Sequence, residues 1–302
     1  MAINPTVTIA IPTYNRPDFV LQAIESALNQ TYHNIEVIIA DNSPEDDTEK
    51  IVRTIVDSRL RYCRHDRNIG FSANWNYCLS IASGEYFLLL SDDDLLEPTA
   101  IEHLLAPFTG SKGEEVAFVY GRVNIEDTAV AASTDGPLSE TVPSFTKEFF
   151  SGRRSIYPCS TLFRREDMRE LGGYDEGRYK YALDAAIWIG TGFTRQHVIF
   201  VRDIVGKYRM HPGNLTSTAS CRIWIDGLNN LFKLAAEMVT HAGMTPDNIL
   251  NEEKGFIGRL LYHLLKKNIS IGNIDSVLVA REYIGTRRAL SLAVSAFFRV
   301  LK

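Results

Sequence analysis

Three consecutive carboxylates, Asp92, Asp93 and Asp94, lie just after the predicted strand 85–90. Like charges at the end of a buried strand repel one another, and their ionised forms are unfavourable in a partly dry site. A hard divalent cation such as Mn²⁺ or Mg²⁺ removes that penalty, takes oxygen ligands and leaves positions for phosphate oxygens. The run therefore predicts a metal-assisted phosphate site. The alternative is a polar turn in which Asp94 caps the helix that begins near Pro98.

A second set of candidate residues lies in the segment 207–214, where Arg209 and His211 occupy alternate positions at a strand end. Side chains two residues apart on a strand face the same side of the sheet. Arg209 is able to neutralise a departing phosphate group, and His211 is able to ligate a metal or to bind a phosphate oxygen. The alternative for His211 is a structural role, which is the commoner one for a lone histidine.

The elements that position these groups alternate between strand and helix over the first hundred residues. The predicted strands are 7–11, 35–40, 60–65 and 85–90. One helix is predicted to begin at residue 17, a second to begin at residue 46, and a third to span 71–82. Such repeats form a mostly parallel sheet with right-handed crossovers. Ligands of these sheets bind outside the carboxyl ends of the strands, so the polar residues 13–15, 41–42 and 91–94 are expected along one rim.

Beyond residue 98 the pattern is less regular. It predicts helices over 99–105, 166–171 and 183–191, strands over 116–120, 160–163 and 197–208, and mostly helix from 218 onward. The stretch 128–145 is rich in Ser, Thr, Pro and Ala, and it is predicted to be a mobile loop.

Bulk composition limits the class of protein. The 302 residues are 45% hydrophobic and 23% charged, as in ordinary globular proteins, and the net charge of −5 argues against nucleic acid as the main partner. Four scattered cysteines without a C-x-x-C pair suit reduced thiols. No signal peptide is evident at the N-terminus, and no apolar run reaches the roughly 20 residues of a spanning helix. These features predict a cytoplasmic protein.

Four ordered motifs resemble those of the inverting glycosyltransferases of family 2, which have the GT-A fold. The resemblance lies in residues 9–16, 30–43, 67–76 and the aspartate run after 84–86. It is close over about the first hundred residues and looser as far as His211. It implies an α/β fold of the GT-A type, with a mixed, mostly parallel sheet flanked by helices and a helical C-terminal appendage. The implied parts are a nucleotide-sugar-binding half (1–98), an acceptor-binding half (99–216) and a helical C-terminal region (217–302).

The resemblance also implies roles for individual residues along the donor. The residues implied to bind the nucleotide or the rest of the donor are Pro12, Thr13, Tyr14, Asn15, Asp41, Arg67, Asp92 and Arg209. Asp41 would accept the N–H of a uracil-type base, and Asp92 would contact the ribose. Asp93 would hold Mn²⁺ or Mg²⁺, with Asp94 and His211 as further candidate ligands. Many members have Asp where this chain has Ser91, so the ligand register within 92–94 stays open.

The resemblance points to Asp184 as the base that takes the proton from the acceptor hydroxyl. Its apolar surroundings, with Trp188 one helical turn further on, fit a carboxylate that faces a partly dry cleft. The family usually has Glu where this chain has Leu183. The competing candidate is Asp175, within a segment that is expected to form a structural turn.

These roles predict transfer of a sugar from a nucleotide diphosphate donor, UDP- or dTDP-linked, to a glycan or lipid-linked acceptor with inversion, in bacterial-type polysaccharide or lipopolysaccharide assembly. A nucleotidyltransferase is disfavoured because residues 12–17 contain no glycine. A non-catalytic sugar-nucleotide or glycan-binding module with the same fold is the alternative, supported by the departures at Ser91 and Leu183.

The C-terminal stretch 286–302 has the pattern of an amphipathic helix, with a polar stripe that includes Arg288, Arg299 and Lys302. Two explanations stay open. The helix packs on the protein or on a homodimer partner, or it makes peripheral contact with an anionic membrane, on the inner face of the plasma membrane.

Overall fold

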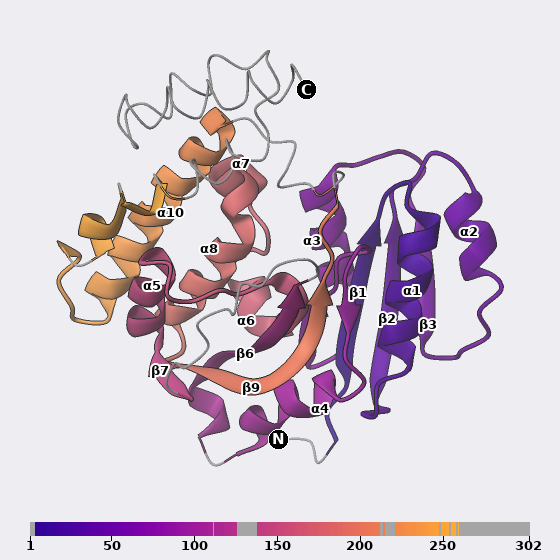
Figure 1. The fold of residues 1–302 in the computed structure, drawn as a ribbon, viewed down its shortest axis with the longest axis horizontal. Coiled ribbons are helices and arrows are strands. Elements are labelled where there is room, and N and C mark those ends of the chain that lie inside the picture. Colours follow the sequence, from indigo (N-terminus) through magenta and orange to yellow (C-terminus); the bar gives the residue numbers. More distant parts are fainter. Residues whose placement is uncertain are drawn as a thin grey trace, which may run out of the picture.

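The computed structural model describes residues 4–110, 112–125, 138–211, 214, 221–247, 249–253, 255–257 and 259. These residues form one mixed, mostly parallel sheet with helices on both faces (Figure 1). The strand order is β3-β2-β1-β4-β8-β6-β9-β5, and β7 pairs with β9 outside this path. The predicted mixed, mostly parallel sheet flanked by helices is confirmed.

The first four strands build the parallel part of the sheet. They are β1 (Val7–Thr13), β2 (Ile35–Asp41), β3 (Leu60–Arg64) and β4 (Tyr86–Leu89). Strands β1, β2 and β4 are almost entirely buried, as expected for strands covered on both faces. Their register places Thr13 beside Asp41. Because β1, β2 and β4 are parallel neighbours, the polar residues that follow them lie at one rim, as predicted.

The second part of the sheet mixes strand directions. It contains β5 (Leu95–Leu96), β6 (Val116–Ile125), β7 (Ser139–Thr141), β8 (Thr161–Arg164) and β9 (His197–Tyr208). Strand β8 is antiparallel to both β4 and β6, whereas β6 and β9 form a long parallel ladder. The short strand β5 pairs antiparallel with β9. The sheet is therefore continuous across the position near residue 98 where the pattern of the sequence changes.

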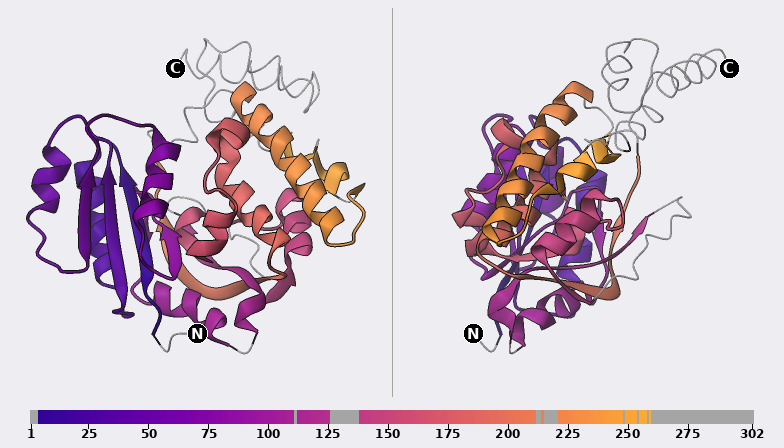
Figure 2. Two further views of the ribbon diagram at one scale, coloured as in Figure 1. Left: turned by 180° about the vertical axis from the view of Figure 1, so that it is seen from behind. Right: turned by 90° about the vertical axis from the view of Figure 1, so that its left-hand side faces the viewer.

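The helices cover the two faces of the sheet with separate apolar clusters. Helices α1 (Pro17–Leu28), α2 (Asp47–Val52) and α4 (Ala100–Leu105) pack on one face. The other face is covered by helices that include α3 (Phe71–Ile81), α5 (Val142–Phe150), α6 (Arg165–Glu170), α8 (Leu183–Gly190) and α10 (Cys221–His241). Helix α7 (Glu176–Tyr179) precedes α8. Figures 1 and 2 show α5, α8 and α10 together on the opposite side of the molecule from β3.

The prediction of a mobile loop over 128–145 is wrong for its C-terminal part. Residues 139–141 form β7, and α5 begins at Val142. The Thr141 hydroxyl accepts a hydrogen bond from the Ser144 amide, and Pro143 stands in the first turn, so the local sequence contains a helix start. Val142, Phe145 and Phe150 are buried in the core. The rest of the stretch, 128–137, and the amphipathic stretch 286–302 lie outside the described residues.

None of the helices that the structure describes is both long and apolar enough to span a bilayer.

Gly84, in the turn before β4, is expected to be intolerant of even one added methyl group. A Cβ at this position would lie 2.6 Å from the amide nitrogen and from the hydroxyl oxygen of Thr8 in the adjacent strand. We expect Gly84→Ala to lower the free energy of unfolding by about 2 kcal/mol, because backbone atoms cannot yield to an overpacked group as side chains do. Urea denaturation checks this value.

Gly110→Ala is the matched control, because its Cβ would have its nearest neighbour, the carbonyl oxygen of Pro107, at 3.6 Å. Its effect should stay within about 0.5 kcal/mol. Equal losses in the two variants would contradict the close approach of residue 84 to Thr8.

Candidate functional site

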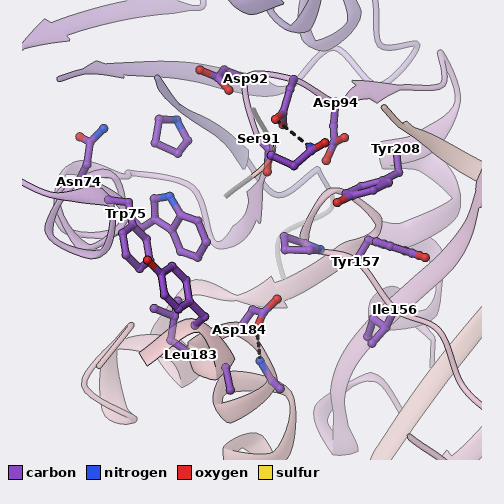
Figure 3. Close-up of a pocket in the computed structure, with 18 of the residues that line it drawn as sticks. Asn74, Trp75, Ser91, Asp92, Asp94, Ile156, Tyr157, Leu183, Asp184 and Tyr208 are labelled. Carbon is purple, nitrogen blue, oxygen red and sulfur yellow. Dashed lines mark hydrogen bonds between the residues drawn. The ribbon is translucent and has the colours of Figure 1, made fainter. Parts of the chain in front are cut away.

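A cavity of about 730 Å³ opens at the carboxyl ends of β1 and β4. The three consecutive carboxylates at 92–94, called the acidic run below, line one wall of the cavity. Asp184, in the first turn of α8, lines another. Figure 3 shows Asp92 and Asp94 on one side of this space and Asp184 with Leu183 on the opposite side, with Trp75 between them along the edge. Two acidic sites that are 92 positions apart in the sequence therefore face the same space.

Asp92 and Asp93 are buried, and they share one cationic partner. Arg16 Nη1 lies 2.9 Å from Asp92 Oδ1 and 2.7 Å from Asp93 Oδ2. The Thr13 hydroxyl also donates to Asp92 Oδ2 at 2.8 Å. Thr13, the last residue of β1, and Arg16, just after it, thus contact the acidic run directly, and a single guanidinium nitrogen bridges the two carboxylates.

Burial makes the acidic run electrostatically costly. It raises the pKa of Asp92 to about 6, with Arg16 acting to lower that pKa and Asp93 to raise it. Burial and the neighbouring Asp93 also raise the pKa of Asp94, to about 7. Carboxyl groups with such raised pKa values gain from any additional positive charge nearby.

His211 and Asn214 converge on Asp93. His211 Nε2 lies 2.9 Å from Asp93 Oδ2, and the amide group of Asn214 donates to the same oxygen at 3.3 Å. The Asn214 Oδ1 in turn accepts a hydrogen bond of 2.6 Å from the His211 backbone amide. The His211 ring stacks on Phe19 with 4.9 Å between centroids. These contacts place the imidazole beside the carboxylate that the resemblance assigns to the metal.

Arg209 contacts the backbone of the acidic run. Its guanidinium donates to the carbonyl oxygens of Asp93 and Asp92, the latter at 3.5 Å, and to Gln22 Oε1 at 2.7 Å. The group also lies over the ring of Phe19, 4.7 Å from its centroid. The described residues that line the cavity do not include Arg209. These contacts suit a residue that holds the turn 92–93 in place.

Asp94 has different partners from those of Asp93. Its Oδ1 accepts a hydrogen bond of 3.1 Å from the Arg209 backbone amide, and the buried Cys159 thiol lies against it. Asp94 still borders the cavity. Among the three carboxylates, Asp93 is the one on which Arg16, the residue before α1, and side chains of the segment after β9 converge.

Asp93 and His211 are able to supply part of the ligand set of a divalent cation. Within the described part of the chain, no group of three or more His, Cys, Asp or Glu side chains is arranged to hold a metal ion. A carboxylate and an imidazole at 2.9 Å supply two ligands. Mg²⁺ and Mn²⁺ are commonly held by one or two protein ligands, and water and substrate phosphates complete their coordination. The pair Asp93–His211 therefore suits an ion that arrives with a diphosphate.

The predicted nucleotide loop borders the cavity through Pro12, Thr13 and Tyr14. Asn15 has a left-handed backbone, with φ at 54°, and its amide donates to the Ser43 hydroxyl at 2.9 Å. This turn directs the next residue toward the acidic run. Backbone strain at a non-glycine residue is commonly retained at functional sites.

Asp41 is fully buried at the end of β2, where its carboxylate has two partners. Its Oδ1 accepts from the Ser43 amide at 2.7 Å, and its Oδ2 accepts from the Tyr62 hydroxyl, also at 2.7 Å. The described cavity lining includes neither Asp41 nor the exposed Arg67, but it includes their neighbours Asn42 and Asn68. The role of Asp41 in base recognition stays a prediction.

Asp184 lies among aromatic rings. Those that line the same cavity include Phe71, Trp75, Tyr181 and Trp188, and the rings of Phe71 and Tyr181 are nearly parallel with 5.7 Å between centroids. Burial raises the pKa of Asp184 to about 6, against the effect of the Ala185 amide, which donates to it at 2.8 Å. A carboxylate with this pKa is ionised at neutral pH and is a stronger base than an exposed aspartate.

The competing candidate, Asp175, has a structural position. Its carboxylate caps α7 by accepting a hydrogen bond of 2.9 Å from the Arg178 amide. The cavity lining, as far as the structure describes it, does not include Asp175. This arrangement fits the predicted structural turn.

Sequence reasoning assigned no role to several residues that line the site. Arg16, Trp75 and Asn214 belong to the segments 9–16, 67–76 and 207–214 that it singled out, and Tyr181 lies three residues before Asp184. Only Arg16 could have been found from the sequence, because it directly follows residues 13–15, which the resemblance assigns to the donor, and precedes Pro17, the first residue of α1. The other three contacts depend on how segments far apart in sequence pack together.

The sequence is similar to a known protein family and to several of its members. The family model described as "Glycosyl transferase family 2" matches residues 8–172. An uncharacterised glycosyltransferase of Rickettsia prowazekii is 25% identical over 316 aligned positions, which cover 99% of this chain and 97% of that protein. The Escherichia coli UDP-Glc:alpha-D-GlcNAc-diphosphoundecaprenol beta-1,3-glucosyltransferase WfaP is 38% identical over 120 residues, which cover 40% of this chain and 47% of that protein.

Solved structures share the fold. TarS of S. aureus in complex with UDP-GlcNAc has a TM-score of 0.63 at 13% identity, over 96% of this chain and 91% of that one. The mannosyltransferase PcManGT of Pyrobaculum calidifontis, in complex with GDP-Man and Mn²⁺, has a TM-score of 0.60 at 16% identity, over 98% and 88%.

Proposed function

Because the chain belongs to glycosyl transferase family 2 and is a glycosyltransferase, we propose that it transfers a sugar from a nucleotide diphosphate donor to an acceptor hydroxyl with inversion. The observation that carries this proposal is the cavity in which the acidic run and Asp184 line opposite walls. A donor on the acidic wall would present its anomeric carbon to an acceptor beside Asp184.

On the donor side, we assign the nucleotide to the half of the domain that ends near residue 98. Pro12, Thr13, Tyr14 and Asp92 would lie along it, and a UDP- or dTDP-linked sugar is favoured by the family role of Asp41. Asn15 and Arg67, which lie outside the described lining, keep their donor roles as predictions. Asp93 and His211 would hold Mn²⁺ or Mg²⁺, which supplies neutralisation of the charge that develops on the leaving diphosphate.

On the acceptor side, ionised Asp184 accepts the proton of the attacking hydroxyl as its oxygen bonds to the anomeric carbon. The bond from that carbon to the diphosphate oxygen breaks at the same time, and the electron pair leaves with the nucleotide diphosphate. Attack from the face opposite the leaving group inverts the carbon. Arg209 acts through the backbone of the acidic run as a positioning residue, and direct contact with the diphosphate stays a prediction.

The acceptor that we propose is a glycan or a lipid-linked glycan in bacterial-type polysaccharide or lipopolysaccharide assembly. The name of the related E. coli enzyme describes transfer to a sugar on diphosphoundecaprenol. Aromatic rings around Asp184 support an acceptor that offers apolar faces for stacking.

A turnover experiment tests the proposal. The purified chain is incubated with Mn²⁺ and a panel of UDP-, dTDP- and GDP-linked sugars, with and without bacterial glycan and lipid-linked acceptors, and free nucleotide diphosphate is measured. Release of the nucleotide diphosphate that depends on an acceptor is expected. Tight donor binding without release under all conditions would instead indicate a non-catalytic module.

The pH dependence of turnover should report the ionisation of Asp184. Its raised pKa of about 6 means that the base is lost as the pH falls through that value, whereas an ordinary aspartate would stay ionised there. At saturating donor, we expect the rate of acceptor transfer to be level above about pH 7 and to fall about tenfold per unit below about pH 6. When donor and Mn²⁺ are both saturating, so that the cation keeps Asp92 and Asp94 ionised, the residual rate of Asp184→Asn should lack this fall. A wild-type rate that stays constant down to pH 5 would contradict the assignment.

A further inference from the structure

Arg16 occupies the position of a cation between the two carboxylates. One of its nitrogens, Nη1, lies within 2.9 Å of both Asp92 Oδ1 and Asp93 Oδ2. Its backbone begins α1 just before Pro17, and its side chain makes no capping bond within that helix. The guanidinium therefore binds the carboxylates of the acidic run and does not cap the helix.

The carboxylate oxygen that Arg16 contacts is also the one reached by the residues assigned to the ion. Asp93 Oδ2 lies 2.7 Å from Arg16 Nη1, 2.9 Å from His211 Nε2 and 3.3 Å from Asn214 Nδ2. A divalent ion bound by Asp93 and His211 would lie within a few ångströms of the guanidinium. Two positive groups at that separation repel strongly inside a protein, so the ion and Arg16 in its present position exclude each other.

Arg16 is more exposed than the two carboxylates that it bridges. Its side chain is 27% exposed, while those of Asp92 and Asp93 are 7% and 8% exposed. Arg16 also borders the cavity. A long side chain at the cavity wall can swing toward a ligand, and a guanidinium binds phosphate oxygens well. The carboxylates, in contrast, are fixed by Thr13, His211 and Asn214.

We propose that Arg16 binds the carboxylates of Asp92 and Asp93 before the donor arrives. When the donor binds, the Arg16 guanidinium moves to the diphosphate, and Asp93 becomes available to the divalent ion. The inference rests on the proposed function, because it takes Asp93 and His211 as the ion ligands. The ion alone then binds weakly, because it must break the contacts of Arg16 with both carboxylates. The ion and the diphosphate bind tightly together, because Arg16 moves from the carboxylates to the phosphates. Arg16 is thus a positioning residue that couples two ligands.

Binding of Mn²⁺ alone, measured by electron paramagnetic resonance without any nucleotide, tests the inference. We expect Arg16→Gln to bind Mn²⁺ at least about tenfold more tightly than the wild-type chain, since the competing charge is gone. Arg16→Lys keeps that charge and should stay within about threefold of wild type. Arg53→Gln is the matched control, because Arg53 is an exposed residue of the same half and pairs with Glu49. It should bind Mn²⁺ as the wild-type chain does.

Calorimetric titration with UDP gives the second measurement. In wild type, saturating Mn²⁺ should tighten UDP binding by at least about tenfold, and this gain should be clearly smaller in Arg16→Gln, because the coupling is reduced. Thermal unfolding covers the case in which Arg16→Gln is unstable, since it leaves two buried carboxylates without their cation. Mn²⁺ should then raise the melting temperature of Arg16→Gln more than that of wild type.

The outcomes separate this inference from the proposed function. If Arg16→Gln binds Mn²⁺ no more tightly than wild type, or if Arg16→Lys binds it as tightly as Arg16→Gln, the inference is overturned. In both cases a wild-type chain that binds Mn²⁺ together with UDP leaves the metal assignment intact. If the wild-type chain binds no Mn²⁺ even with UDP, the metal assignment itself fails, and the inference fails with it.

Discussion

Asp184→Asn should lower the rate of acceptor transfer by about 10³-fold, because general base catalysis commonly contributes factors of this size. The amide keeps the shape of the carboxyl group but cannot accept the proton of the attacking hydroxyl. The substituted side chain lies on the wall opposite the acidic run, so donor binding should change by no more than about twofold. Steady-state transfer rates and calorimetric titration with UDP give the two quantities.

The control for this variant is Asp175→Asn. Asp175 caps α7, so its replacement should cost about 1 kcal/mol or less of stability and leave the transfer rate within about threefold of wild type. If Asp175→Asn lost transfer while Asp184→Asn kept it, the roles of the two aspartates would be reversed. Full activity of both variants would leave the reaction without an identified base.

Asp93→Asn should abolish detectable Mn²⁺ binding in the presence of UDP and lower turnover by about 10³-fold, because several kcal/mol of leaving-group stabilisation are lost. The reason is geometric. Asp93 Oδ2 is the oxygen on which Arg16, His211 and Asn214 converge, and an amide there is a poor ligand for a hard divalent ion. Electron paramagnetic resonance and the turnover assay measure the two effects.

Asp94→Asn is the informative comparison for this second prediction. The partners of Asp94 are the Arg209 amide and the Cys159 thiol, so its replacement should weaken Mn²⁺ binding far less than that of Asp93. The exposed Asp46 supplies the neutral control, Asp46→Asn. If Mn²⁺ binding survives in Asp93→Asn and is lost in Asp94→Asn, the ligand register is shifted by one residue.

The sequence was sufficient to predict the parallel part of the sheet, because its signals are local. Buried strands such as β2 are continuous apolar runs, and parallel neighbours bring their carboxyl ends to one rim. The convergence of Thr13 and Asp92 follows from that rule alone. The helix α5 was missed because composition was given more weight than the local start signal at Thr141 and Pro143.

The sequence indicated which residues belong to the site better than it indicated which groups those residues contact. The resemblance implies donor roles for Arg209 and Asp41, and it does not indicate that Arg209 contacts a carbonyl group of the acidic run or that Asp41 accepts hydrogen bonds from Ser43 and Tyr62. Such partners depend on side-chain rotamers and on packing between distant segments, which neither periodicity nor motif spacing encodes. The bridge formed by Arg16 belongs to the same class, since its partners are more than 70 positions away.

The continuity of the sheet limits how this enzyme can be recombined with its relatives. Near residue 98, where donor and acceptor functions would be expected to divide, β4 is paired with β8, and β5 is paired with β9. In a chimera joined at that position, strands from two different proteins would have to pair with each other, and their register and twist would have to match. Exchanges of donor or acceptor preference should therefore succeed more often as loop grafts at the rim than as swaps of whole halves.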